Sequence, residues 1–335
     1  MGIFNAIWKT QAKDWTYAKI PPNKTPDGLA HAVLNAEDGY LNVWLQSFRI
    51  TNVRRGLKTF YGTVYSFISL PVLDENGGKK AEFQVLTTPG QLKNIDASHV
   101  DRIVVLNQRL LGPIPYRGGD LEIEIGLFSI KEADLAGPFL SILDSLSKTA
   151  GVSFISAALP FAGPIKDGIN LLSGASADSI LEIGLSTNYS PAETGWFAVM
   201  RAQKNQVDPT HFRVDSNRQL VNDESGQPIS EFPYLVFRIE VSKQRDDFFL
   251  IPDLSDAYKK LRDEIKGGDL AKINEAFAVF RRTALSSPDL LISDAQRLVA
   301  KVEADVKTAV GTKTMSQGAP TILRELKDVS LYQHP

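Results

Sequence analysis

The sequence predicts a mainly β protein with appended helices: an antiparallel β-sandwich with an inserted helical and apolar segment and a C-terminal helical layer. Three observations predict this fold class. Segments in which apolar and polar residues alternate recur between residues 41 and 241, as is typical of half-buried antiparallel strands. From residue 253 the apolar residues recur at helical spacing instead. An uncharged stretch at 149–165, rich in Ala, Ser and Gly, interrupts the strands.

A chain of 335 residues, 43% hydrophobic and 23% charged, is long enough for one large domain or two of unequal size. We expect a sandwich at 41–250 with a helical insertion at about 131–178. An N-terminal amphipathic segment and linker at 1–40 precede it, and a helical subdomain at 251–312 and a tail at 313–335 follow. An insertion of roughly fifty residues is far longer than the usual strand connection of about 4–6 residues.

The alternation of apolar and polar residues is clearest in the strand predicted at 120–130. Its apolar residues point to one side, while Glu122, Glu124 and Phe128 point to the other, where the two carboxylates are expected to be solvated. The Gly118–Gly119 pair precedes this strand as a turn. The same kind of pattern, or a short apolar run, predicts further strands at 41–47, 60–70, 81–86, 103–106, 181–186, 196–202 and 234–241.

The C-terminal third shows three apolar stripes at helical spacing. We expect the first helix to end at Gly267–Gly268 and the third to begin at Ser287–Pro288. The polar tail carries one apolar patch at Ile322, Leu323 and Leu326 and is predicted to be a loose arm. The stripes are Leu254, Tyr258, Leu261 and Ile265; Leu270, Ile273, Phe277 and Phe280; and Leu291, Ala295, Leu298, Val302 and Ala309.

Composition argues against several kinds of chemistry. A formal net charge of −2 gives no overall basic field for nucleic acid. The absence of cysteine excludes disulfides, thiol catalysis and cysteine-ligated zinc, and it fits a cytoplasmic location. The four histidines are scattered singly, and the chain has neither a glycine-rich phosphate loop nor a G-x-S-x-G elbow. We therefore predict no catalytic residues, no cofactor and no metal site.

Three segments carry a resemblance to a known family: LNVWLQSFRI at 41–50, FYGTVYSFISL at 60–70 and RGGDLEIEIGLF at 117–128. They resemble the calcium-dependent phospholipid-binding β-sandwiches of synaptotagmin and protein kinase C, over roughly residues 40–130 and 180–245. The resemblance implies docking on a membrane or a partner through loops at one end of the sandwich. Calcium sites of that family need several loop aspartates converging on one ion. This chain departs from that pattern, because it offers only Asp74, Glu75, Asp120, Asp246 and Asp247, without a repeated D-x-D.

Two apolar elements are the candidate contact surfaces. At the N-terminus, apolar side chains share one face if the segment is helical, and this face either packs on its own domain or docks on an interface. The N-terminus lacks the long apolar core of a signal peptide. Residues 149–165 are either buried against the sandwich, a protein-docking element, or a membrane-inserting one. The candidate contact residues are Ile3, Phe4, Ile7, Trp8, Val152, Phe154, Ile155, Leu159 and Phe161.

These observations predict a non-enzymatic interaction protein that docks on a protein partner, or on copies of itself, through its apolar insertion and appended helices. The alternative is a latent membrane-active effector, pore-forming or membrane-disrupting, of the kind found in bacterial immune and toxin systems. In that case the insertion is sheltered at rest and released by cleavage or a conformational signal. A membrane surface is then the partner, and nucleic acid is not expected as a partner in either case.

Overall fold

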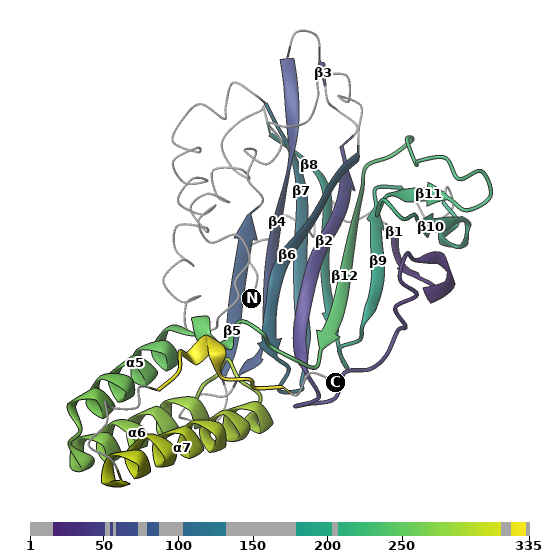
Figure 1. Cartoon of the computed structure of the whole chain (residues 1–335). Helices are drawn as coiled ribbons and strands as arrows, with labels where there is room; N and C mark the ends of the chain where they lie inside the picture. Colours follow the sequence, from purple (N-terminus) through teal and green to yellow (C-terminus); the bar gives the residue numbers. More distant parts are fainter. Residues whose placement is uncertain are drawn as a thin grey trace.

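The computed structural model describes residues 16–50, 54–55, 58–72, 79–86, 103–131, 179–202, 207–315 and 323–332. This part of the chain is rich in antiparallel sheet and contains three α-helices. Figure 1 shows the long strands running side by side, with the three helices gathered at one end of them. The mainly β prediction with appended helices is confirmed at this level.

One five-stranded sheet has the order β1-β9-β12-β2-β6, and every pairing in it is antiparallel. Its edge strand β1 lies within the stretch predicted to be a linker, and it pairs with β9 so that Thr16 lies opposite Met200. The apolar segment predicted at 103–106 extends to Pro115 as β6, because the strand continues along β2. The strands are β1 (Thr16–Ile20), β2 (Tyr40–Arg49), β6 (Ile103–Pro115), β9 (Gly195–Met200) and β12 (Tyr234–Ser242).

A second five-stranded sheet has the order β3-β4-β7-β8, with β5 paired to β4. A separate two-stranded hairpin joins β10 to β11 and lies beside β1 and β9 (Figure 1). The strands are β3 (Arg54–Arg55), β4 (Lys58–Val72), β5 (Lys79–Leu86), β7 (Leu121–Lys131), β8 (Ser179–Tyr189), β10 (Phe212–Val214) and β11 (Leu220–Asn222).

Among the described residues, the largest hydrophobic cluster draws alternate residues from both five-stranded sheets. Leu121, Ile123, Ile125 and Leu127 of β7 belong to it, as the alternation predicts, together with Phe237 of β12. Because every second side chain of these strands is buried in one common cluster, the period-two pattern of the sequence gives the correct core-facing side.

The opposite side of β7 is buried as well. Glu124 is only 6% exposed, and the aromatic side chains of Tyr65, Phe67 and Phe128 are also buried. The prediction that the carboxylates of this strand are solvated is therefore wrong for Glu124. The alternation identified the two sides of the strand correctly, but a period of two does not tell whether the second side faces water or more protein.

Three helices follow the strands: α5 (Pro252–Gly267), α6 (Leu270–Leu285) and α7 (Ile292–Met315). Helix α5 ends at Gly268, whose φ of 81° lies in the left-handed region that favours glycine. Asp269 then caps α6 by accepting hydrogen bonds from two backbone amides. The three predicted stripes are buried except for half-buried Phe277 and for Leu270, the first residue of α6, which is 56% exposed.

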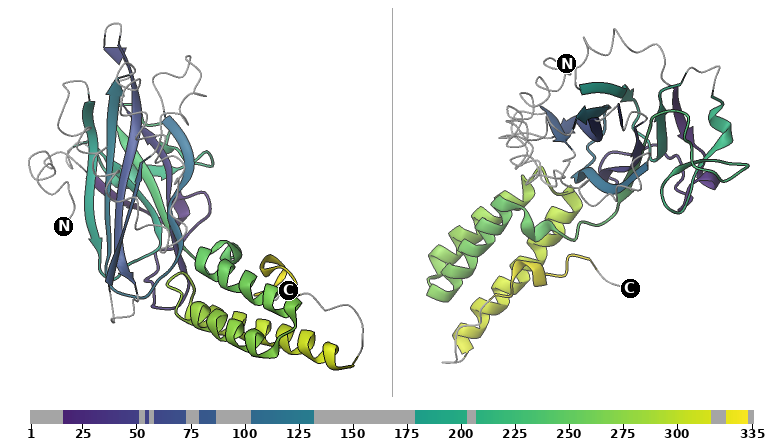
Figure 2. Two further views of the ribbon diagram at one scale, coloured as in Figure 1. Left: turned by 90° about the vertical axis from the view of Figure 1, so that its left-hand side faces the viewer. Right: turned by 90° about the horizontal axis from the view of Figure 1, so that it is seen from above.

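Helix α7 begins at Ile292, later than the predicted start at Ser287–Pro288. Residues 323–332 are not a loose arm, because Leu323, Leu326, Val329 and Leu331 are buried in the same hydrophobic cluster as the helices. Both views in Figure 2 show this segment lying along the helices. Leu323 and Leu326, from the patch that looked isolated in the sequence, are thus part of the helical core, while Ile322 lies outside the described residues.

The two ends of the sheets differ in what is attached to them. The helices lie at the end where β2 begins and β6 stops, since Tyr40 contacts α7 and Pro113 contacts Arg245. Residues 132–178 join β7 to β8 at the opposite end, where Ile130 pairs with Ser179. Of the helices in the described ranges, none combines the length and the apolar composition that a membrane-spanning helix needs.

Candidate functional site

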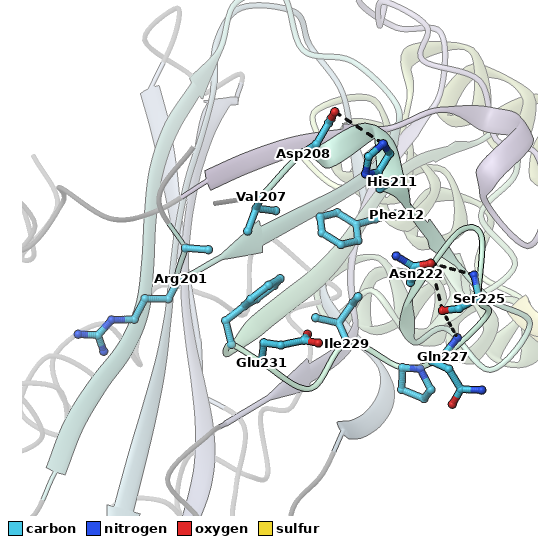
Figure 3. A pocket seen from close by; sticks show the side chains of 13 residues that line it. Arg201, Val207, Asp208, His211, Phe212, Asn222, Ser225, Gln227, Ile229 and Glu231 are labelled. Carbon is cyan, nitrogen blue, oxygen red and sulfur yellow. Dashed lines mark hydrogen bonds and ion pairs between the residues drawn. The ribbon is translucent and has the colours of Figure 1, made fainter. Parts of the chain in front are cut away.

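A pocket of about 670 Å³ lies between the β10–β11 hairpin, the segment that follows β9 and the loop that precedes β12. Figure 3 shows its lining side chains, which come from these separate stretches of chain. The lining residues are Arg201, Ala202, Val207, Asp208, His211, Phe212, Asn222, Ser225, Gln227, Pro228, Ile229, Glu231 and Phe232.

One wall of the pocket is built by a short turn at residues 208–211. Asp208 caps the 3-10 helix η7 (Pro209–His211) by accepting hydrogen bonds from the Thr210 amide at 2.9 Å and the Thr210 hydroxyl at 2.6 Å. These bonds stabilise the ionised carboxylate and lower the pKa of Asp208 below its ordinary value. The turn presents His211 at the rim, where its ring Nε2 lies 3.9 Å from Asp208 Oδ2.

The opposite wall is a second side-chain-stabilised turn, after β11. Asn222 Oδ1 accepts hydrogen bonds from the Glu224 amide at 3.1 Å and the Ser225 amide at 2.8 Å. Gly226 takes a positive φ of 69° there, which a residue with a side chain rarely adopts. Because the turn is closed by its own side chains, the edge of the pocket is held without help from a ligand.

The floor of the pocket is apolar. Val207, Phe212 and Ile229 are buried in one cluster with Trp196 of β9 and Val236 of β12. The ring of Phe212 meets that of Phe232 edge to face, with centroids 6.2 Å apart, which is a favourable geometry for aromatic rings. An apolar floor with a polar rim is the usual construction of a small ligand site.

Charged groups of the pocket point in different directions. In Figure 3 the side chain of Arg201 extends away from the others, while Glu231 is drawn next to Ile229 at the pocket. Glu231 is exposed, and its Oε2 accepts a hydrogen bond from the Ser230 amide at 3.2 Å. Inside the pocket the balance of charge is therefore negative, through Glu231 and Asp208.

A second cluster of polar groups lies at the junction between the strands and the helices, and it is buried. The guanidinium of Arg245 is 0% exposed. Its Nη1 donates to the carbonyl oxygens of Pro113 and Asp289, both at 2.8 Å, and its Nε donates to Asp247 Oδ1 at 2.8 Å. One arginine thus joins β6 to the segment that precedes α7.

Asp294, in the first turn of α7, is the other centre of this junction. Its Oδ2 accepts hydrogen bonds from the hydroxyls of Tyr40 at 2.7 Å and Tyr332 at 2.6 Å. Burial, followed by the charge of Asp294 and neighbouring groups, raises the pKa of Tyr40 well above its ordinary value, and burial does the same for Tyr332. The Tyr332 hydroxyl in turn accepts from the Arg245 amide at 2.8 Å.

A third connection runs through Glu37, a loop residue with a φ of 63°. Its Oε2 accepts a hydrogen bond from the amide of Ile292, the first residue of α7, at 3.1 Å, and a carboxylate is favourable at a helix N-terminus. Glu37 is also paired with Arg117, whose Nη2 donates to the Leu290 carbonyl at 2.6 Å. Most polar groups of the junction are paired with one another, although the buried Nε of Arg117 has no hydrogen-bond partner, and this pairing indicates a structural role.

The contact residues predicted from the sequence lie outside the described residues: Ile3, Phe4, Ile7 and Trp8 at the N-terminus, and Val152, Phe154, Ile155, Leu159 and Phe161 in the insertion. Their proposed contacts remain predictions. Of the acidic residues compared with a calcium site, Asp247 bonds to Arg245, and Asp120 accepts from the Asn188 amide group at 3.1 Å. Within the described ranges, no three His, Asp or Glu side chains are grouped as metal ligands.

Sequence reasoning missed the pocket, although two signals for its walls were present. Asp208–Pro209–Thr210 and the Asn222–Gly226 stretch are both turn sequences, and a short hairpin between them could have been predicted. Compared with known proteins, the chain matches no family model, no curated protein and no solved structure.

Proposed function

We propose that this protein is a non-enzymatic interaction protein, which docks on a protein partner through the apolar segment 149–165 and its appended helices. In this proposal the two five-stranded sheets pack as a β-sandwich that acts as a rigid support. The shared hydrophobic cluster, with Leu41 and Phe237 from one sheet and Ile68 and Ile125 from the other, supports the sandwich arrangement.

One observation carries the proposal: β7 and β8 are neighbours in the same sheet, with Ile130 opposite Ser179. Two such strands can be joined by a hairpin loop of about 2–5 residues, but here they are joined by residues 132–178. The strand pairing does not require that length. A long insertion that the sheet does not need is typical of a functional element, and this one contains the uncharged stretch 149–165.

The test replaces residues 131–178 by an Asn-Gly turn between Ile130 and Ser179, which stay opposite each other. We expect the variant to keep a cooperative thermal unfolding transition and its sheet signal in circular dichroism, because the register of β7 and β8 is preserved. We expect it to lose the protein that co-purifies with the intact chain from its natural source. A folded variant that retains the same partner would overturn the proposal.

A point substitution sharpens this test. Phe154→Asp places a charge in the uncharged segment and is expected to weaken partner association without loss of fold. Val33→Asp is the matched control, since Val33 is apolar and 57% exposed but lies far from the insertion in the sequence. Equal effects of the two substitutions on association would count against a specific role for the insertion.

A membrane-active effector is the second candidate, and the uncharged composition of residues 149–165 is the observation that favours it. Dye leakage from liposomes distinguishes it from protein docking. The effector reading predicts leakage by the activated chain and none after Phe154→Asp or Ala158→Asp. Absence of leakage by the activated chain would remove this candidate, and leakage that survives both substitutions would show that residues 149–165 do not cause it.

A further inference from the structure

We propose that the pocket beside the β10–β11 hairpin binds a lysine side chain of a partner protein, with the ammonium group near Glu231 and the aliphatic stem on the apolar floor. This inference deepens the proposed function, because it names a chemical feature of the partner. It depends on lining residues at 201–202 and 207–232 and not on residues 132–178, so this inference and the proposed docking through residues 149–165 can fail separately.

The pocket is large enough to admit an inserted side chain and is accessible from solvent. A volume of about 670 Å³ lies within the range of about 300–1,000 Å³ for small ligand sites. The rim residues Asp208, His211 and Glu231 are exposed, whereas the floor residues Phe212 and Ile229 are buried. A side chain that projects from another protein can therefore reach the floor from solvent.

The floor matches an aliphatic stem that ends in a cation. Val207, Phe212 and Ile229 offer apolar surface, and a lysine stem buries well on such surface while its charged head stays near water. An ammonium group over the face of an aromatic ring is attracted by the ring, and the aromatic residues Phe212 and Phe232 line the pocket together with Glu231. The aromatic surface and the carboxylate of Glu231 therefore both favour a positively charged ligand group.

Charge decides between a cation and other ligands. An anion would meet the carboxylates of Glu231 and Asp208, and the nearest arginine of the lining, Arg201, extends away in Figure 3. A ligand that is wholly apolar would cover Glu231 without giving the carboxylate a partner, which is unfavourable. A cation gives Glu231 a charge-assisted hydrogen bond. Lysine suits this single carboxylate, because its ammonium is a compact point charge.

The experiment compares three blocked amino acids, each acetylated at the α-amine and capped as an N-methylamide: lysine, norleucine and Nε-acetyllysine. Norleucine keeps an aliphatic stem without the ammonium, and Nε-acetyllysine keeps the full stem without the charge. Binding to the full chain is measured by ligand-observed NMR titration. We expect the lysine probe to bind at least about tenfold more tightly than the other two, a difference of the size one charge-assisted contact gives.

Two variants locate the binding in the pocket. Glu231→Gln is expected to remove the preference for lysine, and Glu231→Lys is expected to weaken the lysine probe by at least about tenfold. Glu224→Lys is the matched control, because Glu224 is exposed in the same stretch between β11 and β12 but does not line the pocket. Equal affinity for all three probes, or a lysine affinity unchanged in folded Glu231→Lys, would overturn the inference.

Discussion

The junction at the helices and the pocket at the hairpin use the same kinds of residue in opposite ways. At the junction, Arg245 and Asp294 are buried, and aromatic hydroxyls or carbonyl oxygens satisfy their charged atoms. At the pocket, Glu231 and His211 are exposed above buried Phe212. A buried polar group has to be satisfied within the protein, whereas an exposed one beside an apolar floor is available to a ligand. The contrast separates structural charges from candidate binding charges.

The largest loss of stability is expected from Arg245→Ala. The substitution removes hydrogen bonds to Pro113, Asp289 and Asp247 and leaves polar groups buried without their partner. Loss of one member of such a buried charged pair costs about 3–5 kcal/mol, and we expect this decrease in the free energy of unfolding by urea titration. Lys243→Ala is the control, since Lys243 pairs with Asp38 on an exposed surface, where a pair contributes about 0–1 kcal/mol. Similar losses for both would refute a special role for the junction.

A smaller loss of stability is expected from Tyr40→Phe and from Tyr332→Phe. Each removes one hydroxyl donor to Asp294 Oδ2, and a hydrogen bond to a charged group contributes about 1.5–3 kcal/mol. Because both hydroxyls bond to the same oxygen, the double variant is expected to deviate from the sum of the single ones. Additive losses in urea unfolding would mean that the two tyrosines act independently.

Alkaline pH should weaken the same junction. Folding raises the pKa of Tyr40 above its ordinary value, so its contribution is fully present below about pH 10, where the unfolded tyrosine begins to ionise. It is lost at about 1.4 kcal/mol per pH unit as pH rises from there toward the folded pKa. Unfolding measured at pH 9 and pH 11 is therefore expected to show a smaller loss in Tyr40→Phe than in the natural chain. An identical loss in both would contradict this assignment.

The smallest effect on stability is expected at the pocket. Glu231→Gln and His211→Ala change exposed side chains outside the buried cluster, and such substitutions are usually within about 0.5 kcal/mol. Urea unfolding of both variants is expected to match that of the natural chain. A loss of more than about 2 kcal/mol would show that the pocket rim is part of the framework and would remove the contrast with the junction.

Local patterns in the sequence predicted the elements that depend on local physics. Alternation placed Leu121 and Ile125 in the core, and Gly268 marked the end of α5 because its backbone is left-handed. The start of α7 was predicted too early. Its Ile292 amide is capped by Glu37, which is distant in the sequence, so no local signal marks the helix start.

The sites depend on residues that are far apart in the sequence, and this limited their prediction. Asp294 bonds to Tyr40 and Tyr332, and the pocket combines residues near 201, 211, 225 and 231. Glu124 illustrates the same limit, because the alternation cannot show what covers the outer side of β7. Turn residues such as Asn222 are recognisable alone, but the space between two turns is not.

The hydroxyl of Tyr332 has a consequence for how the chain is made on the ribosome. Tyr40 in β2 and Asp294 in the first turn of α7 are synthesised before Tyr332. Asp294 Oδ2 can therefore accept from the Tyr40 hydroxyl first, and it gains its second donor only when Tyr332 has been synthesised. The boundary between strands and helices therefore lacks one of its hydrogen bonds until that point in synthesis. We expect the helices to reach their final attachment only after Tyr332 has been made, because its hydroxyl also accepts a hydrogen bond from the Arg245 amide.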